Sequence, residues 1–299
     1  MEQNSSGRRS PGQMLREAVA DSTIQVPGAF NALVGQLIEQ SGYDAVYLSG
    51  AAMSAGVMAL PDVGLFTLSE LVAQTTLLTR AVDIPVIVDA DTGFGEALNV
   101  ERTVHELEAA GAAAIQLEDQ RLPKRCGHLS GKSLVETAEM CAKIRAGVAA
   151  KHDSNLVIIA RTDARGVTTV DDAIDRAKAY LDAGADWIFP EALRGPEEFE
   201  KVAREVKAPL IANMTEFGQS PLLSLDALAE MGYAVVLYPV TAMRVAMRAV
   251  EAALAVIADE GTQESLLDLM QTRQELYDLL GYAGYEERDK RYFGGGGAK

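Results

Sequence analysis

One pattern recurs along most of this chain. A short apolar run rich in β-branched residues ends at a polar residue, and an amphipathic helical stretch follows it. Near-continuous apolar strands that alternate with helices are typical of a parallel sheet covered by helices. Eight such units in about 250 residues favour an α/β fold of one kind, the (β/α)8 barrel of the TIM type. A doubly wound open sheet is the alternative, but no Gly-x-Gly-x-x-Gly turn follows the first predicted strand.

The predicted elements extend from residue 23 to residue 280. The strands are expected at Thr23–Val26, Ala45–Leu48, Pro85–Val88, Ala114–Leu117, Leu156–Ala160, Trp187–Phe189, Leu210–Ala212 and Val235–Tyr238. The helices that follow them are expected near Ala32–Gln40, Leu68–Ala81, Val100–Ala110, Val135–Ala149, Val170–Ala183, Pro196–Val206, Leu225–Met231 and Thr241–Ala258. A further helix, Glu264–Leu280, lies beyond the eighth unit, so it must pack outside the ring of helices or against another subunit.

The regular alternation indicates a single domain with a short tail at each end. We expect residues 13–293 to form the barrel and its C-terminal helical extension. Residues 1–12 are rich in Ser, Gly, Asn and Arg, and residues 294–299 are mostly Gly. Such segments bury little apolar surface, so we expect the first to be disordered and the second flexible.

The balance of charge limits the class of partner. With 43 acidic against 27 basic residues the formal net charge is −16, whereas nucleic acids and anionic membranes bind basic faces. No apolar run reaches about 18 residues, the length of a membrane span, and no apolar segment of a signal peptide follows Arg8 and Arg9. Two cysteines form no disulfide framework. We therefore expect a cytoplasmic protein that binds neither nucleic acid nor membrane.

Polar residues follow the predicted strands at the point where each strand ends. In a barrel of this type, the loops at the carboxyl ends of the strands carry the chemistry. In chain order these residues are Ser49, Gly50, Asp89, Asp91, Glu118, Asp119, Arg161, Asp163, Glu191, Asn213 and Thr215. One polar strand end would mean little, since every strand must stop somewhere. Six in succession indicate a functional ring with several carboxylates and an arginine.

Asp89 and Asp91 are the first candidates for a metal site. They have one residue between them, so their side chains point to the same face of an extended chain. With Glu118 they supply hard oxygen ligands without a His or Cys cluster, which favours Mg²⁺ or Mn²⁺ over Zn²⁺. A pair of capping residues on a loop is the structural alternative, but the position at a strand end before Gly93-Phe94-Gly95 favours metal binding.

The segment Leu122–Ser133, called the cysteine loop below, is unusual in so acidic a chain. Its thiol and basic side chains are Lys124, Arg125, Cys126, His128 and Lys132. Neighbouring cations lower the pKa of a thiol, and glycines let a loop close over a site. A solvated basic loop with an incidental cysteine is the alternative. A divalent cation and Arg161 suit a substrate with several carboxylates. On such a substrate we expect Cys126 to donate a proton, and a nucleophilic role is the alternative.

The motif Lys124-Arg-Cys-Gly-His128 resembles the signature of the isocitrate lyase and phosphoenolpyruvate mutase superfamily, in the form typical of the 2-methylisocitrate lyases. The likeness extends over nearly the whole chain. The other matching motifs are Tyr47-Leu-Ser-Gly50, Leu60-Pro-Asp62, Val88-Asp-Ala-Asp-x-Gly-Phe-Gly95, Glu118-Asp-Gln120, Ala160-Arg-Thr-Asp-Ala164, Phe189-Pro-Glu-Ala192, Asn213-Met-Thr-Glu-Phe-Gly218, Leu237-Tyr-Pro239 and Met270-Gln-Thr-Arg273.

The resemblance implies a Mg²⁺-dependent retro-aldol cleavage of 2-methylisocitrate, a small tricarboxylate, to pyruvate and succinate, as in propionate breakdown by the methylcitrate cycle. The implied metal-binding residues are Asp89, Asp91, Asp62 and Glu118. The implied substrate-binding residues are Ser49, Gly50, Ala51, Gly127, Arg161, Glu191, Asn213, Thr215, Arg244 and Arg273. The implied catalytic residues are Cys126, Lys124, His128 and Tyr47. Cys126 would protonate the succinate half, and Tyr47 is a candidate base for the substrate hydroxyl.

The resemblance also implies a homotetramer in which the eighth helix of the barrel is exchanged between subunits, and the extra C-terminal helix fits such an arrangement. Isocitrate is the nearest alternative substrate, followed by dimethylmalate, oxaloacetate and phosphonopyruvate. A non-catalytic metabolite-binding barrel is the alternative from another class. Many members have Gly where this chain has Ala51, whose methyl group can narrow the pocket. Phe189 and Leu237 are the expected walls of a pocket for the substrate's methyl group.

Overall fold

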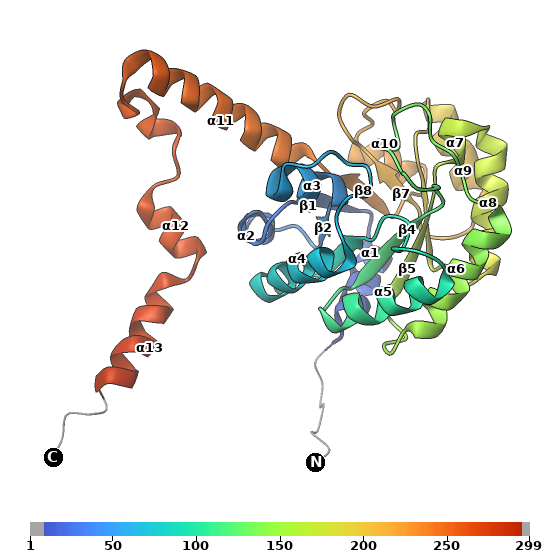
Figure 1. The fold of residues 1–299 in the computed structure, drawn as a ribbon, viewed down its shortest axis with the longest axis horizontal. Coiled ribbons are helices and arrows are strands. Elements are labelled where there is room, and N and C mark those ends of the chain that lie inside the picture. Colours follow the sequence, from blue (N-terminus) through green and yellow to red (C-terminus); the bar gives the residue numbers. More distant parts are fainter. Residues whose placement is uncertain (1–8, 295–299) are drawn as a thin grey trace. The chain divides into compact units, whose positions relative to one another are not determined.

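The computed structural model describes residues 9–294 and contains a barrel of eight parallel strands (Figure 1). The strands are β1 (Ile24–Ala29), β2 (Val46–Leu48), β3 (Val86–Asp89), β4 (Ala114–Glu118), β5 (Val157–Thr162), β6 (Trp187–Pro190), β7 (Ile211–Asn213) and β8 (Val235–Tyr238). They pair in the order β6-β5-β4-β3-β2-β1-β8-β7. A parallel bridge between Ile188 of β6 and Leu210, just before β7, joins the two ends of this order. The predicted (β/α)8 barrel is therefore confirmed.

Helices alternate with the strands and cover the outside of the barrel (Figure 1). They are α2 (Ala32–Gln40), α3 (Gly50–Met58), α4 (Leu68–Ala81), α5 (Ala97–Ala109), α6 (Thr137–Ala150), α7 (Ala164–Val167), α8 (Val170–Asp182), α9 (Pro196–Glu205) and α10 (Leu225–Glu230). The eight helices predicted to follow the strands are all present, with ends shifted by at most a few residues. The sequence pattern did not predict α3 and α7. α3 consists of small residues and methionines without a polar face, so no amphipathic period marks it.

A helix that the sequence pattern did not predict, α1 (Pro11–Asp21), precedes the first strand. Its start has clear physical causes, because the Ser10 hydroxyl accepts a hydrogen bond from the Gln13 amide at 3.2 Å and Pro11 occupies the first turn. Gly12, expected in the disordered tail, is thus helical and buried. The remaining parts of the two expected tails, residues 1–8 and 295–299, lie outside the described residues.

Helix α1 closes one end of the barrel. Its Leu15 is fully buried among the side chains that fill the barrel interior. Its Arg16 lies 2.5 Å from Asp186, which stands just before β6, and donates to the Asn155 carbonyl before β5 at 2.8 Å. Both partners mark the amino ends of strands, so α1 covers that end of the barrel and leaves the carboxyl ends for the site.

The core has two layers that follow from the alternation of side chains along each strand. On β2, Tyr47 belongs to the cluster inside the barrel, whereas Val46 and Leu48 belong to the cluster between the sheet and the helices. All three side chains are almost fully buried. Residues at the carboxyl ends of the strands therefore stand on a packed and rigid base.

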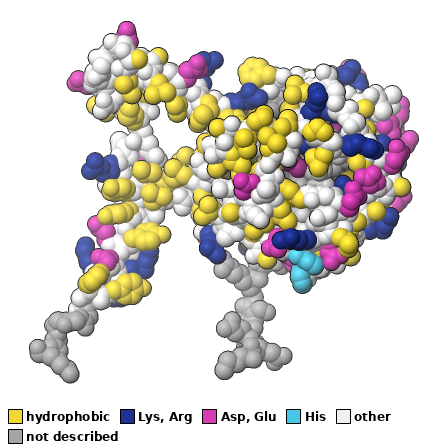
Figure 2. Space-filling model, in the orientation of Figure 1, with side chains coloured by type: hydrophobic (Ala, Val, Ile, Leu, Met, Phe, Trp, Pro, Cys, Tyr) yellow, Lys and Arg dark blue, Asp and Glu magenta, His cyan; other side chains and the backbone are white. Residues whose placement is uncertain are grey.

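Residues from Arg244 onward form a second compact unit, separate from the unit that ends at Met243. Its elements are α11 (Thr241–Glu260), which begins in the first unit, a 3-10 helix (Glu264–Leu269), α12 (Arg273–Leu279) and α13 (Tyr282–Gly294). The single helix predicted at Glu264–Leu280 is wrong, because Thr272 and Glu275 form a capping box that begins α12 anew. Hydrophobic side chains are exposed over much of this unit (Figure 2). None of the helices between residues 9 and 294 combines the length and apolar character of a membrane crossing.

Candidate active site

Three carboxylates gather at the carboxyl ends of β3 and β4. Oxygen atoms of Asp89, Asp91 and Glu118 all lie within 4.8 Å of one another, and the three side chains are buried. We call this group the carboxylate cluster. The strands bring it together, since Asp89 pairs with Gln116 in the register of β3 and β4. The structure therefore assembles three of the four predicted metal-binding residues in one place.

Hydrogen bonds hold Asp89 from three sides. Its Oδ2 accepts from the backbone amide of Gly50 at 3.2 Å. Its Oδ1 accepts from the Asp91 amide at 3.2 Å and from the Gln116 side-chain amide at 3.1 Å. In Glu118, by contrast, Oε1 is buried and makes no hydrogen bond among the described residues. A buried carboxylate oxygen without a donor, beside two other carboxylates, fits a hard divalent cation.

Burial makes the charges of the carboxylate cluster costly. It raises the pKa of Asp91 to about 7, although Lys124 opposes that rise. Burial likewise raises the pKa of Glu118 well above its ordinary value, against the opposing effect of Arg161 and Lys124. Carboxylates crowded in this way are stabilised in their ionised form by an additional cation. The electrostatics and the unbonded oxygen of Glu118 thus indicate the same kind of ligand.

Lys124 and Asp62, both predicted site residues, lie beside the carboxylate cluster. The Lys124 ammonium is buried, lies 2.6 Å from Asp91 Oδ1 and also contacts Asp62. Burial lowers the pKa of Lys124, but the negative charges of Asp91 and Glu118 raise it by more. The pKa of Lys124 therefore lies well above its ordinary value. Lys124 therefore remains charged and directs its ammonium at carboxylates. Asp62 reaches the cluster through Lys124.

Arg161, at the end of β5, is the central cation of the ring. Its guanidinium donates to both oxygens of Asp163 at 2.9 and 3.1 Å. It also lies 3.5 Å from Glu118 Oε2 and 3.2 Å from Glu191 Oε2. Its Cζ stands over the aromatic face of Phe189, 5.2 Å from the centroid. Burial lowers its pKa, yet these carboxylates raise it well above the ordinary value. Arg161 thus links the cluster to the other half of the ring.

Glu191 connects three of the predicted residues. The His128 Nε2 lies 2.9 Å from its Oε1, and the Asn213 amide donates to both oxygens at 3.3 and 3.1 Å. Burial raises the pKa of Glu191, but Arg161 and His128 outweigh that effect and keep the pKa well below its ordinary value. Glu191 is therefore ionised at neutral pH. Asn213 Oδ1 is buried without a hydrogen-bond donor among the described residues, so it is available to a substrate hydroxyl.

The cysteine loop covers this half of the ring, but its thiol differs from the prediction. Burial raises the pKa of Cys126, and the His128 amide only partly opposes the rise. The expected activation by flanking cations is therefore wrong. The Lys124 ammonium pairs with carboxylates, and the Arg125 guanidinium donates to the Ser130 carbonyl at 3.2 Å. Cys126 is thus a protonated thiol at neutral pH, the form that a proton donor needs and a nucleophile does not.

Tyr47 and Ser49 lie on and just after β2, on the side of the carboxylate cluster. The Tyr47 hydroxyl donates to Gln116 Oε1 at 2.5 Å, and burial raises its pKa well above the ordinary value. The phenol is therefore protonated, which favours a hydrogen-bonding role over that of a base. Ser49 caps α3 by accepting from the Ala52 amide at 3.2 Å. The amides of Gly50 and Ala51 stand at this helix start, where anions bind.

The structure does not place all predicted substrate-binding residues in the ring. Thr215 follows β7 and is half-buried. Arg244 and Arg273 belong to the second compact unit, on α11 and α12, so their roles stay predictions. Phe189 and Leu237 are buried in the cluster inside the barrel, as walls of a pocket above it would be.

The sequence reasoning missed Gln116 and Gln219, and it named Gln120 and Lys132 without giving either a role. Gln116 orients both Asp89 and Tyr47, and a polar residue within the apolar strand β4 was a signal that could have found it. Gln120 clamps the start of the cysteine loop, since its side chain exchanges two hydrogen bonds with the backbone of Arg125 at 2.8 and 3.0 Å. Gln219, which contacts the same loop, and Lys132, which belongs to it, are considered below.

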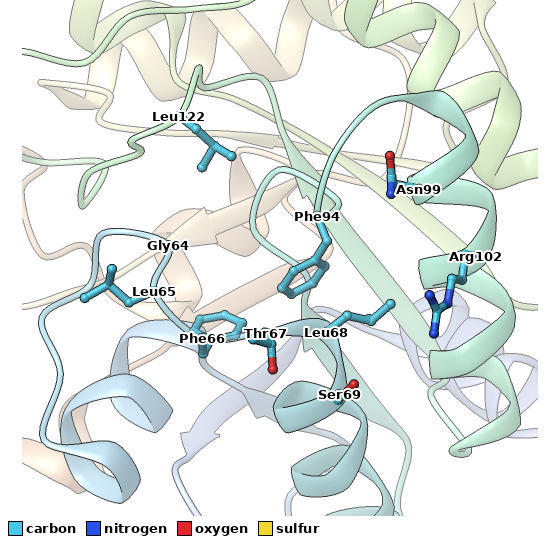
Figure 3. A pocket seen from close by; sticks show the side chains of 10 residues that line it. All are labelled: Gly64, Leu65, Phe66, Thr67, Leu68, Ser69, Phe94, Asn99, Arg102 and Leu122. Atoms are coloured by element: carbon cyan, nitrogen blue, oxygen red, sulfur yellow. The ribbon is translucent and has the colours of Figure 1, made fainter.

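A cavity of about 490 Å³ lies between the start of α4, α5 and the start of the cysteine loop (Figure 3). Its lining residues are Gly64, Leu65, Phe66, Thr67, Leu68, Ser69, Phe94, Asn99, Arg102 and Leu122. The rings of Phe66 and Phe94 meet edge to face, with centroids 5.8 Å apart. Phe66 also lies 3.4 Å from the point where a Cβ on Gly50 would stand, and Asp89 Oδ2 lies 3.1 Å from the same point. None of the predicted site residues lines the cavity.

Comparisons with known proteins agree with this arrangement. The family model described as phosphoenolpyruvate phosphomutase matches residues 15–258. The 2-methylisocitrate lyase of Aeropyrum pernix is 55% identical over 93% of this chain and 90% of its own length, and that of Escherichia coli is 44% identical over 93% and 95%.

Two solved structures have the same fold. A 2,3-dimethylmalate lyase, described as a member of the phosphoenolpyruvate mutase and isocitrate lyase superfamily, matches with a TM-score of 0.89 at 33% identity, covering 96% of each chain. A phosphonopyruvate hydrolase in complex with oxalate and Mg²⁺ matches with a TM-score of 0.87 at 31% identity, covering 95% of this chain and all of that one. The chain therefore belongs to the 2-methylisocitrate lyases, within the isocitrate lyase and phosphoenolpyruvate mutase superfamily.

Proposed function

We propose that this protein is a carbon–carbon lyase that cleaves 2-methylisocitrate to pyruvate and succinate with the help of Mg²⁺. The observation that carries the proposal is the presence of two groups in one ring: the carboxylate cluster, and the half-buried Cys126 thiol next to Gly127, whose backbone lies against Arg161 and Glu191. Relatives that are 42 to 55% identical over most of the chain are named 2-methylisocitrate lyases. We propose that the protein is cytoplasmic and serves propionate breakdown.

The residues of the ring suit each step of such a cleavage. Mg²⁺, held by the carboxylate cluster, would stabilise the negative charge that develops on the substrate's oxygens. Mn²⁺ has the same ligand preference. Arg161 and the Ala51 amide at the start of α3 would bind carboxylates, whereas the Gly50 amide already holds Asp89. Asn213 Oδ1 would accept from a hydroxyl.

The proton balance gives Cys126 its role. A base removes the proton of the substrate hydroxyl, a carbonyl forms on the pyruvate half, and the carbon–carbon bond breaks. The electron pair of that bond stays on the succinate half, and Cys126 returns a proton to its carbon. A thiol with a raised pKa is protonated when this step begins. The side chains of His128 and Lys124 order the surrounding charges through Glu191 and Asp91.

Substrate preference is tested first by steady-state cleavage of 2-methylisocitrate, isocitrate, 2,3-dimethylmalate and oxaloacetate, each with Mg²⁺ and with EDTA. We expect a large preference for 2-methylisocitrate that EDTA abolishes. Preference for another substrate would retain the chemistry and refute the proposed substrate.

Apolar contact with one methyl group contributes about 1–3 kcal/mol, so enlarging the pocket at Phe189 should change the preference between 2-methylisocitrate and isocitrate without abolishing turnover.

Cys126→Ser separates a lyase from a binding protein with the same fold. Removing a general acid costs about 10²- to 10⁴-fold in rate, so cleavage should nearly vanish while Mg²⁺ and pyruvate still bind. Cys141→Ser is the matched control, because Cys141 lies on α6 and donates to the Ala179 carbonyl. Unchanged kinetics in the Cys126 variant would refute the catalytic role.

We also propose that the protein is a homotetramer in which α11 packs on a neighbouring subunit. Val250, Leu254 and Ile257 recur on one face of this helix and are 49, 62 and 44% exposed. An apolar helix face of this kind needs a partner. Light scattering during size-exclusion chromatography should give four times the 31.9 kDa of one chain, and Leu254→Glu should lower that mass.

A further inference from the structure

The cysteine loop packs so closely on the ring that one of its residues must lack a side chain. A Cβ on Gly127 would stand 2.4 Å from Glu191 Cγ and 2.5 Å from an Arg161 guanidinium nitrogen. Both neighbours are buried and fixed by ion pairs. The backbone beside Cys126 therefore lies directly against the carboxylate and the guanidinium that are to meet the substrate.

A lysine from the far arm of the loop holds this backbone in place. The Lys132 ammonium donates to the Gly127 carbonyl and lies 2.7 Å from Asp163 Oδ1. The side chains of Lys132 and Asp163 are 1% and 0% exposed. The same Asp163 accepts two hydrogen bonds from Arg161. One buried ammonium thus joins the loop to the carboxylate that orients the substrate-binding arginine.

We propose that Lys132 is a positioning residue for Cys126, which keeps the thiol over the ring by bridging the Gly127 carbonyl to Asp163. This inference rests on the proposed function, since Cys126 needs a fixed position only if it donates a proton to substrate. Among the described residues, Lys132 contacts the Gly127 carbonyl and Asp163, and its charge also helps to lower the pKa of Glu191. It acts through the loop, and none of the family motifs includes it.

The geometry explains why this single residue matters. The arms of the loop meet at one backbone bridge, between Gln120 and Leu134, and Gln120 fixes the first arm only as far as Arg125. Beyond Arg125, the loop depends on side-chain contacts. A buried ammonium must stay paired, because an unpaired buried charge is very costly. If Gly127 moved away from the ring, the Lys132 ammonium would lose the Gly127 carbonyl, one of its two hydrogen-bond acceptors.

The chain offers a matched control at the opposite end of the barrel. Lys151 makes the same kind of bridge, since its ammonium donates to the Leu156 carbonyl at 2.9 Å and lies 3.2 Å from Asp186. Its side chain is 12% exposed, and its bridge lies among the loops at the amino ends of the strands. Lys151→Met therefore removes an equivalent bridge without touching the cysteine loop.

The experiment measures how fast iodoacetamide alkylates Cys126, followed by peptide mass spectrometry so that Cys141 is scored separately. Hydrogen bonds to charged groups are strong enough that losing one should raise the alkylation rate in Lys132→Met about tenfold or more. In the same variant we expect kcat for 2-methylisocitrate to fall about 100-fold with a smaller change in KM, while Mg²⁺ binding and Cys141 alkylation stay unchanged. In Lys151→Met both the alkylation rate of Cys126 and kcat should equal those of the wild type.

A second variant guards against misfolding of the first. A Cβ on Gly166, in α7, would stand 2.7 Å from the Lys132 ammonium, so Gly166→Ala displaces the end of that side chain. Lys132 keeps its charge in this variant, and Arg161 still pairs with Asp163. It should raise Cys126 alkylation in the same direction. Wild-type alkylation rates in both variants, or an equal rise in Lys151→Met, would overturn the proposal. If the wild type cleaves none of the four substrates, the proposed function fails, but the alkylation rates still decide whether Lys132 holds the loop.

Discussion

The carboxylate cluster and the cysteine loop are the two halves of one site, and they are held by different means. Asp89 and Glu118 are the last residues of β3 and β4, and Glu118 is paired with Arg161 across to β5. Backbone hydrogen bonds between strands therefore fix the cluster from both sides. The cysteine loop has no such ladder. Its backbone is joined to the barrel through Gln120 and Lys132, and through Gln219 at its tip.

This difference fits the order of events that a lyase needs. A metal site on strand ends is formed before substrate arrives, because the barrel core fixes it. A proton donor on a loop held by a few side chains can leave to admit substrate and release products, and then return. The comparison predicts that damage to the cluster abolishes metal binding, whereas damage to the loop contacts leaves the metal bound and misplaces the thiol.

The largest effect should come from Asp91→Ala. Removing a ligand from a buried cluster of three leaves too few oxygens to hold Mg²⁺, and the metal's charge stabilisation is worth several kcal/mol. We expect kcat/KM to fall by roughly 10³-fold or more and Mg²⁺ binding by calorimetry to be lost. Cys126 alkylation should stay at the wild-type rate, because Lys124 still pairs with Asp62 and the bonds of Gln120 and Lys132 to the loop backbone are kept.

Asp21→Ala is the control for this variant, since Asp21 is an exposed carboxylate at the end of α1. Retained Mg²⁺ binding in Asp91→Ala would contradict the assignment of the carboxylate cluster. A large rise in Cys126 alkylation would show that the two halves are not held independently.

Gly127→Ala should have the next largest effect and should act on the loop alone. The new methyl group would collide with Glu191 and Arg161, so the loop must lift away from the ring. A displacement of about 1 Å can cost 100-fold in rate, so we expect kcat to fall about 100-fold, with faster Cys126 alkylation and normal Mg²⁺ affinity. In Gly147→Ala the same change meets only ordinary contacts at 3.5 Å or more, and activity should be unaffected. Normal kcat in Gly127→Ala would contradict the closed position of the loop.

The pattern of strands and helices could be predicted from the sequence because it depends on local apolar runs. The strand-end carboxylates followed from it, since parallel strands bring their carboxyl ends together. The regions that resisted prediction have a different origin. α3 lacks an amphipathic period, α1 follows directly on a Ser- and Gly-rich segment, and α12 begins at a capping box inside a stretch that otherwise suits one helix.

The environment of Cys126 could not be predicted, because it depends on where the neighbouring side chains point, and sequence spacing does not determine that. Lys124 and Arg125 are near neighbours of the thiol along the chain, yet their charged groups meet Asp91 and the Ser130 carbonyl. Burial then dominates the thiol and raises its pKa. Lys132 was visible as a basic residue of the loop, but its partner Asp163 lies 31 residues away along the chain.

The affinity for Mg²⁺ should change with pH, by a smaller factor than Asp91→Ala and Gly127→Ala change activity. Burial raises the pKa of Asp91 to about 7, so this carboxyl is protonated in the metal-free protein below that pH and ionised above it. Mg²⁺ must displace the proton, so its affinity should be about tenfold lower at pH 6 than at pH 8. Calorimetry without substrate at the two pH values measures this difference. Equal affinities would mean that Asp91 is already ionised at pH 6.

The smallest effect should come from Gln219→Ala, which tests the tip of the cysteine loop. The Gln219 side chain donates to the His128 carbonyl at 2.8 Å, and its backbone amide donates to His128 Nδ1 at 2.9 Å. The variant removes the first bond and keeps the second. Because the lost bond is exposed and an average hydrogen bond contributes about 1 kcal/mol, Cys126 alkylation should rise only two- to fivefold, well below the effect of Lys132→Met. Gln13→Ala, which removes a similar side-chain bond to Glu17 on α1, should change nothing. A Gln219 effect as large as that of Lys132→Met would mean that the loop is held at its tip rather than by the buried bridge to Asp163.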